Sequence, residues 1–189
     1  MLRKSGPGLG GPYLLPNIHA LVYLCEHFNL HDQAIYWRAV LEMDEYQRRR
    51  LVEVVTGHNL SFKSKRVAVL GFAYKASTSD SRGSPSVDIV RSLLLEGASV
   101  YVYDPRVAAE DVMKAFGCHR DVHVAGAKLF GTLLFGGVAA LQVAFFVTML
   151  ADVRCITDAI RHSDCVIVCT DWEEFKSIDW RAMASEMQV

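Results

Sequence analysis

The sequence has 189 residues, of which 51% are hydrophobic and 22% charged, with a formal net charge of -1 at pH 7. This length and hydrophobicity suit one compact domain with a sizeable core and an appendage. A net charge near zero leaves no electrostatic footprint for nucleic acid, so we expect no nucleic-acid partner. The five cysteines are odd in number and lack C-x-x-C spacing, which predicts reduced, buried thiols, no metal site and a cytoplasmic protein.

The chain begins with a glycine-rich loop at residues 6–11 that leads into a helical pattern over residues 17–55. The segment NLHD interrupts this pattern, and Asp32 is the predicted N-cap of a second helix. The arginines at 48–50 are expected to form the solvated C-terminal end of that helix. The predicted apolar face comprises Leu21, Leu24, Cys25, Phe28, Ile35, Ala39, Met43, Tyr46 and Val52. Such an appendage needs a partner surface, either another domain or another subunit.

After residue 60 the hydrophobic period changes. Residues 65–75, KRVAVLGFAYK, are typical of a strand buried on both faces. Ser84 and Pro85 predict a helix start, Gly97 predicts its end, and residues 98–105 form a second predicted strand. A further helix, ITDAIRHSD, and a further strand, CVIVCTDW, precede a polar loop and a closing helix. This alternation predicts an α/β fold, a Rossmann-like doubly wound parallel sheet preceded by a long linking helical segment.

Residues 129–151 form an apolar segment of 23 residues without charge, which is long enough to span a bilayer. The segments before and after it belong to one predicted sheet, however, and a membrane span would separate them. Gly131, Gly136 and Gly137 also weaken a single helix. Three interpretations stay open: an inserted segment, a buried crossover, and a membrane-associated hairpin.

Two features of the predicted sheet bear on ligand binding. Asp104 closes the second strand, where a Rossmann acid holds a ribose, but the loop after the first strand has no G-x-G-x-x-G pattern for a dinucleotide. Lys75 and Arg82 lie near a helix start capped by Ser84, an arrangement that suits an anion or a diphosphate. The alternative is a solvated loop with two unremarkable charges.

Three stretches carry a resemblance to a known family. VAVLGFAYKASTSDSRGSPSVDIVRSLLLEGASVYVYDPRV and DCVIVCTDWEEFKSIDW resemble the UDP-binding C-terminal domain of the UDP-glucose 6-dehydrogenases, within the UDP-glucose/GDP-mannose dehydrogenase family. LVYLCEHFNLHDQAIYWRAVLEMDEYQRRR resembles the central helix that links the two Rossmann domains and supports dimerisation there. The resemblance covers nearly the whole chain except about 25 residues around the apolar segment.

The resemblance implies roles for individual residues. In the family, a cysteine after the glycine loop holds the sugar covalently during two hydride transfers to NAD. Tyr13 stands at that cysteine position, with Pro16 and Asn17 at the family's lysine and aspartate, so no catalytic residue is expected. Arg82 matches a position that reaches NAD. The implied substrate-binding residues are Lys4, Gly8, Gly10, Tyr74 and Lys75.

The resulting expectation is a fragment: helices and a catalytic-loop remnant at residues 1–60, and a UDP-sugar-binding domain at 61–189 with an apolar insert near 125–150. The family enzyme uses NAD, but none is expected to bind this chain alone. The expected partners are UDP-glucose or a related UDP-sugar, and a second copy or a paralogue through the helical segment 17–55. Three hypotheses stay open: part of a real dehydrogenase, a non-catalytic binding module paired with an intact paralogue, and a degenerate product without function.

Overall fold

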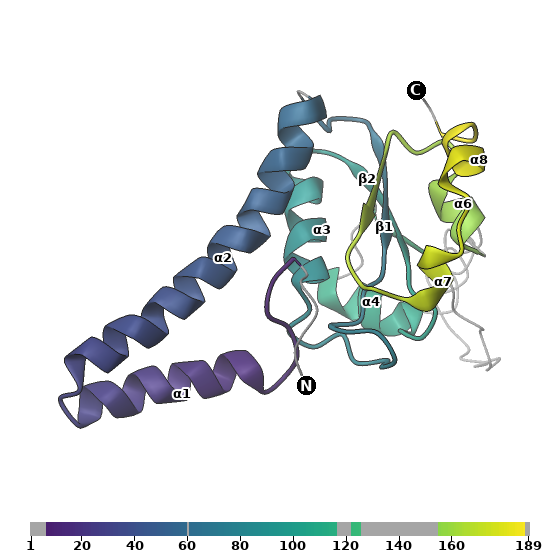
Figure 1. Ribbon diagram of the computed structural model, residues 1–189. Helices are drawn as coiled ribbons and strands as arrows, with labels where there is room; N and C mark the ends of the chain where they lie inside the picture. The colour runs from purple at the N-terminus through teal and green to yellow at the C-terminus, as the bar shows by residue number, and fades with distance from the viewer. Residues whose placement is uncertain (1–6, 60, 117–121, 126–154, 188–189) are drawn as a thin grey trace, which may run out of the picture.

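A helical arm and a sheet domain make up the computed structural model, which describes residues 7–59, 61–116, 122–125 and 155–187 (Figure 1). The arm consists of α1 (Leu14–His27) and α2 (His31–Asn59), which pack against each other as a hairpin. The 29 residues of α2 give a helix about 44 Å long, at the usual rise of about 1.5 Å per residue. The end of the hairpin projects away from the sheet, while α2 also contacts α3 of the sheet domain.

A tight turn joins the two helices of the arm. Asn29 adopts a left-handed backbone with φ of 55°, and the Leu30 amide donates to the Cys25 carbonyl at 2.7 Å. This is the Schellman arrangement that ends many helices. The Ala34 amide then donates to the Leu30 carbonyl at 3.0 Å, so α2 already begins at His31. The prediction of Asp32 as N-cap was therefore wrong, because the turn uses fewer residues than the polar segment NLHD suggests.

Within the described residues the sheet has four strands, all parallel, in the order β3-β2-β1-β4. This confirms the predicted Rossmann-like doubly wound sheet. The strands are β1 (Arg66–Leu70), β2 (Ser99–Tyr103), β3 (Val122–Ala125) and β4 (Cys165–Val168). The chain moves outward from β1 to β3 and then returns to the other side of β1, so the direction of winding reverses between β1 and β4. At such a reversal, parallel sheets place their ligands beyond the carboxyl ends of the strands.

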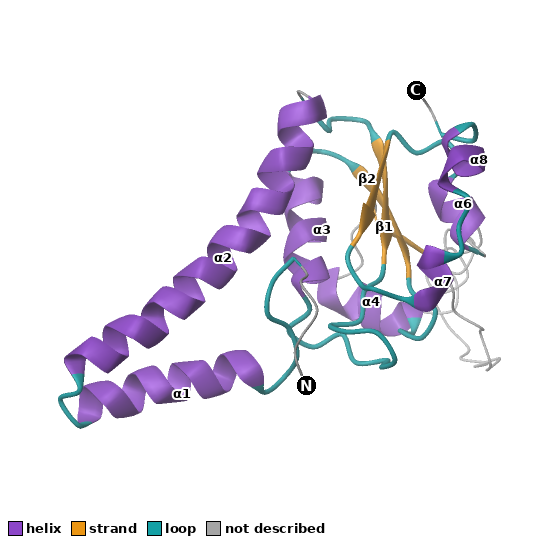
Figure 2. Cartoon of the chain, viewed as in Figure 1, coloured by secondary structure: helices purple, strands orange, loops and turns teal. Residues whose placement is uncertain are grey.

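Helices cover both faces of the sheet, with α3 and α6 on opposite sides (Figure 2). The helices of the sheet domain are α3 (Pro85–Leu95), α4 (Ala109–Phe116), α6 (Ile156–Ile160), α7 (Glu173–Lys176) and α8 (Trp180–Ala184). Residues 67–70 of β1 are 0% exposed, which confirms a strand buried on both faces. The strand ends at Leu70 rather than near Lys75, because Gly71 turns the chain with φ of +93°. Ser84 caps α3 and Pro85 is its first residue, as predicted.

Most of the apolar face predicted for the arm does not pack within the described chain, although Val52 packs against the core of the sheet domain. The buried apolar side chains of the arm are instead Ile18, Val22 and Ala34. Six members of the predicted face stay exposed, namely Leu21, Leu24, Phe28, Ile35, Met43 and Tyr46. Each helix has apolar residues around most of its circumference, and the hairpin buries only the narrow stripe between α1 and α2.

Several predictions fall on residues outside the described part of the chain, including Lys4, Cys118 and the apolar segment 129–151. Among the helices that the structure describes, none combines the length and the hydrophobicity required to cross a membrane. The prediction of buried thiols was wrong for Cys155, which is exposed, and Cys25, Cys165 and Cys169 are only partly exposed. Cys155 is the N-cap residue of α6.

Candidate functional site

The carboxyl ends of β1 and β4 meet in a close backbone contact. A Cβ built on Gly71 would lie 2.5 Å from Thr170 Cβ and 2.7 Å from the Thr170 amide nitrogen, so only glycine fits. The Thr170 hydroxyl donates to the Ala73 carbonyl at 2.7 Å. These contacts join the two loops that flank the reversal of winding.

Asp104, which follows β2, organises the same edge of the sheet from within. Asp104 is 1% exposed, and its carboxylate accepts five hydrogen bonds. The donors are the amides of Phe72, Ala73, Arg106 and Val107, at 2.7–2.9 Å, and Trp172 Nε1 at 3.2 Å. Both carboxylate oxygens are thus occupied by the protein. Asp104 is a structural residue that binds three loops together, and it is not available to hold a ribose.

The same finding tests whether this part of the chain fits NAD. The Phe72 and Ala73 amides at the start of the loop after β1 donate to Asp104, so they cannot donate to a pyrophosphate. The loop also lacks the glycines that allow a dinucleotide to approach the backbone. The described sheet therefore does not fit NAD in the usual Rossmann manner.

Beyond Ala73 the loop carries two exposed cations, Lys75 and Arg82. Lys75 Nζ lies 5.3 Å from the centroid of the Tyr74 ring. Arg82 binds the Asp80 carboxylate through Nε at 3.0 and 3.2 Å and through Nη2 at 2.8 Å. This fork lowers the pKa of Asp80 and raises the pKa of Arg82, in both cases mainly through the hydrogen bonds between their side chains. The sequence predicted that both cations share one loop, but it did not reveal that Arg82 is already paired.

The glycine loop of residues 8–11 packs directly on this cationic loop. A Cβ built on Gly10 would lie 3.0 Å from Pro85 Cδ and 3.1 Å from Tyr74 Cβ. Gly11, with φ of +99°, has the Tyr74 ring 2.9 Å from the position of a Cβ. The structure thus brings together Gly10 and Tyr74, two predicted site residues far apart in the sequence. Gly8 lies farther along the loop, beside Asp44 and Arg48 of α2.

Arg48 holds the glycine loop in place, and the sequence analysis missed it. Its side chain is 13% exposed and donates to Asp44 Oδ2 at 2.9 Å, Asp88 Oδ2 at 2.5 Å and the Leu9 carbonyl at 2.5 Å. The Leu9 amide donates to Asp44 Oδ1. The prediction of a solvated helix end was therefore wrong for Arg48, and α2 continues to Asn59. Only the spacing of Asp44 and Arg48, four residues apart, could have indicated a pair from sequence.

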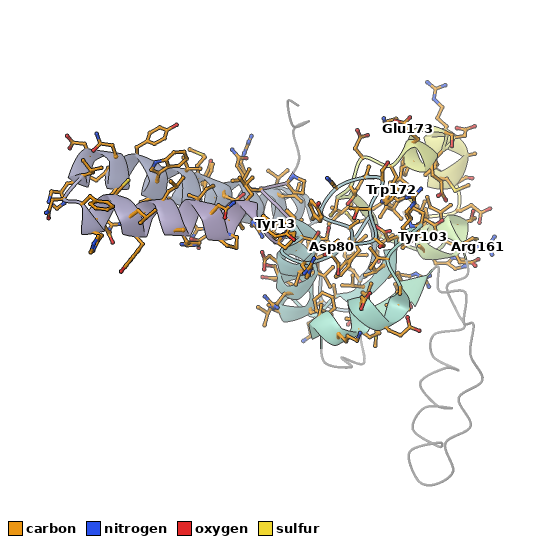
Figure 3. All side chains as sticks on the ribbon, turned by 90° about the horizontal axis from the view of Figure 1, so that it is seen from below. Tyr13, Asp80, Tyr103, Arg161, Trp172 and Glu173 are labelled. Atoms are coloured by element: carbon orange, nitrogen blue, oxygen red, sulfur yellow. The ribbon has the colours of Figure 1, made fainter. Side chains whose placement is uncertain are left out.

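Tyr13 lies where the arm meets the sheet domain, close to Asp80 (Figure 3). It occupies the N-cap position of α1 without a capping bond from its side chain, and it is 73% exposed. Together with Tyr74 it contributes a smaller part of the raised pKa of Arg82. Tyr13 and the half-buried Tyr74 therefore lie near Arg82 at this edge of the sheet, with Lys75 beside Tyr74. Such an arrangement offers aromatic contacts and positive charge to an anionic ligand.

The doubly wound parallel sheet, with its winding reversal between β1 and β4, defines a Rossmann-like α/β domain. The particular family follows from comparison with known proteins. The UDP binding domain of the UDP-glucose/GDP-mannose dehydrogenase family matches residues 68–189, so the chain belongs to this family. The division of the chain between residues 60 and 61 stays a prediction.

Curated relatives match almost the whole chain. It is 33% identical over 186 residues to the UDP-glucose 6-dehydrogenase of Bos taurus, covering 97% of this chain and 34% of the relative. The enzyme of the same name from Drosophila melanogaster is 31% identical over 185 residues, with 97% and 35% covered. The chain therefore spans about a third of the length of these relatives.

Solved structures also match more than nine-tenths of the chain. A UDP-glucose dehydrogenase from Pyrobaculum islandicum has a TM-score of 0.72 at 25% identity, covering 97% of this chain and 37% of that one. A GDP-mannose dehydrogenase from Pseudomonas aeruginosa has a TM-score of 0.62 at 18% identity, covering 91% and 33%, and supports the fold alone. The fold of this chain is thus similar to about a third of each of these larger structures.

Proposed function

We propose that this chain binds UDP-glucose as the nucleotide-sugar-binding part of a UDP-glucose 6-dehydrogenase. The observation that carries the proposal is the match of its sheet domain to the family's UDP binding domain. The names of the curated relatives favour UDP-glucose over other nucleotide sugars. The exposed loop after β1 is the proposed site, because it lies at the winding reversal where parallel sheets bind ligands.

Tyr74 and Lys75 are the proposed substrate contacts within the described residues. Lys75 is exposed, and within the described residues no carboxylate forms an ion pair with it, so its ammonium is available for a diphosphate. Tyr74 supports the glycine loop with its ring and lies beside Lys75. Gly8 and Gly10 are proposed to let the backbone approach the nucleotide sugar closely. Lys4 is the remaining proposed substrate contact.

The chain by itself is proposed not to oxidise its ligand. Tyr13 stands where the resemblance places a cysteine nucleophile, and a phenol with a reference pKa near 10 does not replace a thiolate. The described sheet does not fit NAD, so hydride transfer needs a further domain that supplies the acceptor. Arg82 is the proposed contact to NAD in such an assembly, and reaching it requires release from Asp80. Purified chain supplied with UDP-glucose and NAD should form no NADH above a protein-free blank.

A second copy of the chain is the proposed partner of the arm. The exposed apolar side chains on α1 and α2, among them Tyr23, Phe28, Ile35 and Tyr36, give the arm a surface that favours association. Light scattering after size exclusion should therefore show a dimer. The double substitution Ile35→Asp and Tyr36→Asp should shift it to a monomer, and a wild-type monomer would instead direct attention to a paralogue.

Calorimetric titration tests the binding proposal directly. UDP-glucose should bind the wild-type chain saturably, and Lys75→Ala should weaken binding by about 1.5–3 kcal/mol, the usual range for a hydrogen bond to a charged group. Lys114→Ala is the matched control, because Lys114 lies on α4 and pairs with Asp111 at 3.1 Å. A folded wild-type chain that shows no saturable heat would contradict the proposal. Equal losses in the two variants would contradict the role of Lys75.

A further inference from the structure

Arg48 is the point where three separate segments meet. Its guanidinium joins Asp44 of α2, Asp88 of α3 and the Leu9 carbonyl of the glycine loop. The side chain is mostly enclosed, at 13% exposure, whereas the neighbouring Arg49 is exposed. An arginine can make these three bonds at once because its donors form a rigid planar fork, which an ammonium group cannot reproduce.

The bonds to the loop are made to its backbone and do not depend on its side chains. Arg48 fixes the Leu9 carbonyl, while Asp44, held by Arg48 through its other oxygen, accepts from the Leu9 amide. Of the next two residues, Gly10 packs against Cβ of Tyr74 and Gly11 packs against the Tyr74 ring. The position of the loop over the proposed site is therefore set at Leu9, by a residue that does not itself lie at the site.

From this geometry we propose that Arg48 is a positioning residue that holds the glycine loop over the sugar end of the bound nucleotide sugar. The inference rests on the proposed function, because the sugar end is assigned from Tyr13, which follows the loop and stands at the family's nucleophile position. The uridine diphosphate end is assigned to the loop after β1, which Arg48 does not touch. Loss of Arg48 should therefore affect recognition of the sugar more than recognition of UDP.

Arg48 also contributes to packing between α2 and α3, so a loss of affinity alone would not distinguish positioning from general support. Two measurements separate them. Hydrogen exchange of the Leu9, Gly10 and Gly11 amides reports the loop without any ligand, with the amides of β1 as an internal reference. Titrations with UDP-glucose and with UDP compare ligands that differ by the glucosyl group on the terminal phosphate, and the wild-type chain and Arg49→Met give the reference for the extra charge of UDP.

The experiment uses the full chain with Arg48→Met, Arg48→Lys and the control Arg49→Met. In Arg48→Met, exchange at residues 9–11 should accelerate roughly ten- to hundredfold, as expected for a lost charged hydrogen bond, with the β1 amides unchanged. Affinity for UDP-glucose should fall about tenfold or more while affinity for UDP stays within about twofold. Arg48→Lys keeps the positive charge beside Asp44 and Asp88 but loses the fork, so it should give the same pattern more weakly. Arg49→Met should match the wild type.

Unchanged loop exchange in both Arg48 variants would overturn the inference. Equal losses of affinity for UDP-glucose and UDP would also overturn it, since they would mean that Arg48 supports the domain as a whole. If Arg48→Met does not fold, Arg48→Lys decides by the same criteria. A wild-type chain that binds neither ligand would refute the proposed function, whereas loop exchange would still decide whether Arg48 fixes the loop.

Discussion

Replacing Asp104 by asparagine should be among the most destabilising single changes in the sheet domain. The substitution preserves the size of the side chain but converts one acceptor oxygen into an NH2 group. Oδ1 accepts from the amides of Arg106 and Val107, and Oδ2 accepts from Phe72, Ala73 and Trp172. Whichever way the amide turns, at least two donors lose their acceptor and face another donor.

The expected magnitude follows from these lost bonds. Leaving one buried donor unsatisfied costs about 1–3 kcal/mol, so two donors predict a loss of about 2–6 kcal/mol in the free energy of unfolding. Asp104 is 1% exposed, so water cannot replace the lost acceptor without a rearrangement. Domains of this size have about 5–15 kcal/mol of stability in total, so a folded but weakened variant is expected. Its Tm should fall by roughly 2–4 °C for each kcal/mol lost.

Urea denaturation followed by circular dichroism measures this change, and fluorescence of Trp172, with Trp37 and Trp180 replaced by phenylalanine in both proteins, reports the affected loops. Asp111→Asn is the matched control, because Asp111 is exposed on α4 and its pair with Lys114 should contribute less than about 1 kcal/mol. A loss below about 1 kcal/mol in Asp104→Asn would refute the reasoning. It would mean that the five bonds around the carboxylate contribute little to holding the three loops together.

Three further predictions concern single residues. In urea denaturation, Gly71→Ala should lower the free energy of unfolding by about 2 kcal/mol or more, because φ is positive and the new Cβ would lie 2.5 Å from Thr170 Cβ. A Cβ on Gly57 of α2 meets nothing within 4 Å, so the control Gly57→Ala should be neutral or raise the free energy of unfolding by up to about 1 kcal/mol. Arg82→Gln should raise the pKa of Asp80 toward 3.8 in a carboxyl NMR titration, because the hydrogen bonds from Arg82 lower it in the wild type. The pair stabilises the fold at pH values above the unfolded pKa of Asp80, and this effect is lost as the pH falls through the lower folded pKa. An unchanged pKa of Asp80 in the variant would contradict the fork. Burial raises the pKa of the Cys169 thiol to about 12, so this thiol should resist alkylation at pH 8 in the native chain and react in urea, as mass spectrometry can show.

The sequence predicted the elements whose signals lie within a few residues. The apolar run of β1, the serine and proline at the start of α3 and the glycine after its end were all confirmed. The arm was predicted to be helical and exposed to a partner, but the stripe that packs between α1 and α2 was misassigned. With apolar residues around most of each helix, periodicity alone does not indicate which stripe faces the other helix.

The candidate site was predicted only in part, because its contacts join residues far apart in the sequence. The sequence indicated the glycine loop and the loop after β1 separately, and it assigned Asp104 to a possible ribose contact and Arg48 to solvent. The structure gave both residues interior partners, with Asp104 bonding to residues up to 68 positions away and Arg48 to residues up to 40 positions away. No local pattern distinguishes a carboxylate that binds a ligand from one that binds its own loops.

What the sequence by itself determined is the class of the molecule: a helical arm, parallel strands alternating with helices, and motifs that resemble one enzyme family. These properties follow from short-range periodicity, helix capping and the order of residues along the chain. Only the tertiary structure decided that Arg48 bridges the glycine loop to two helices and that Gly10 lies on Tyr74. The physical reason is that these contacts form only after the arm folds back onto the sheet domain, when charges and backbone groups far apart in sequence are buried together.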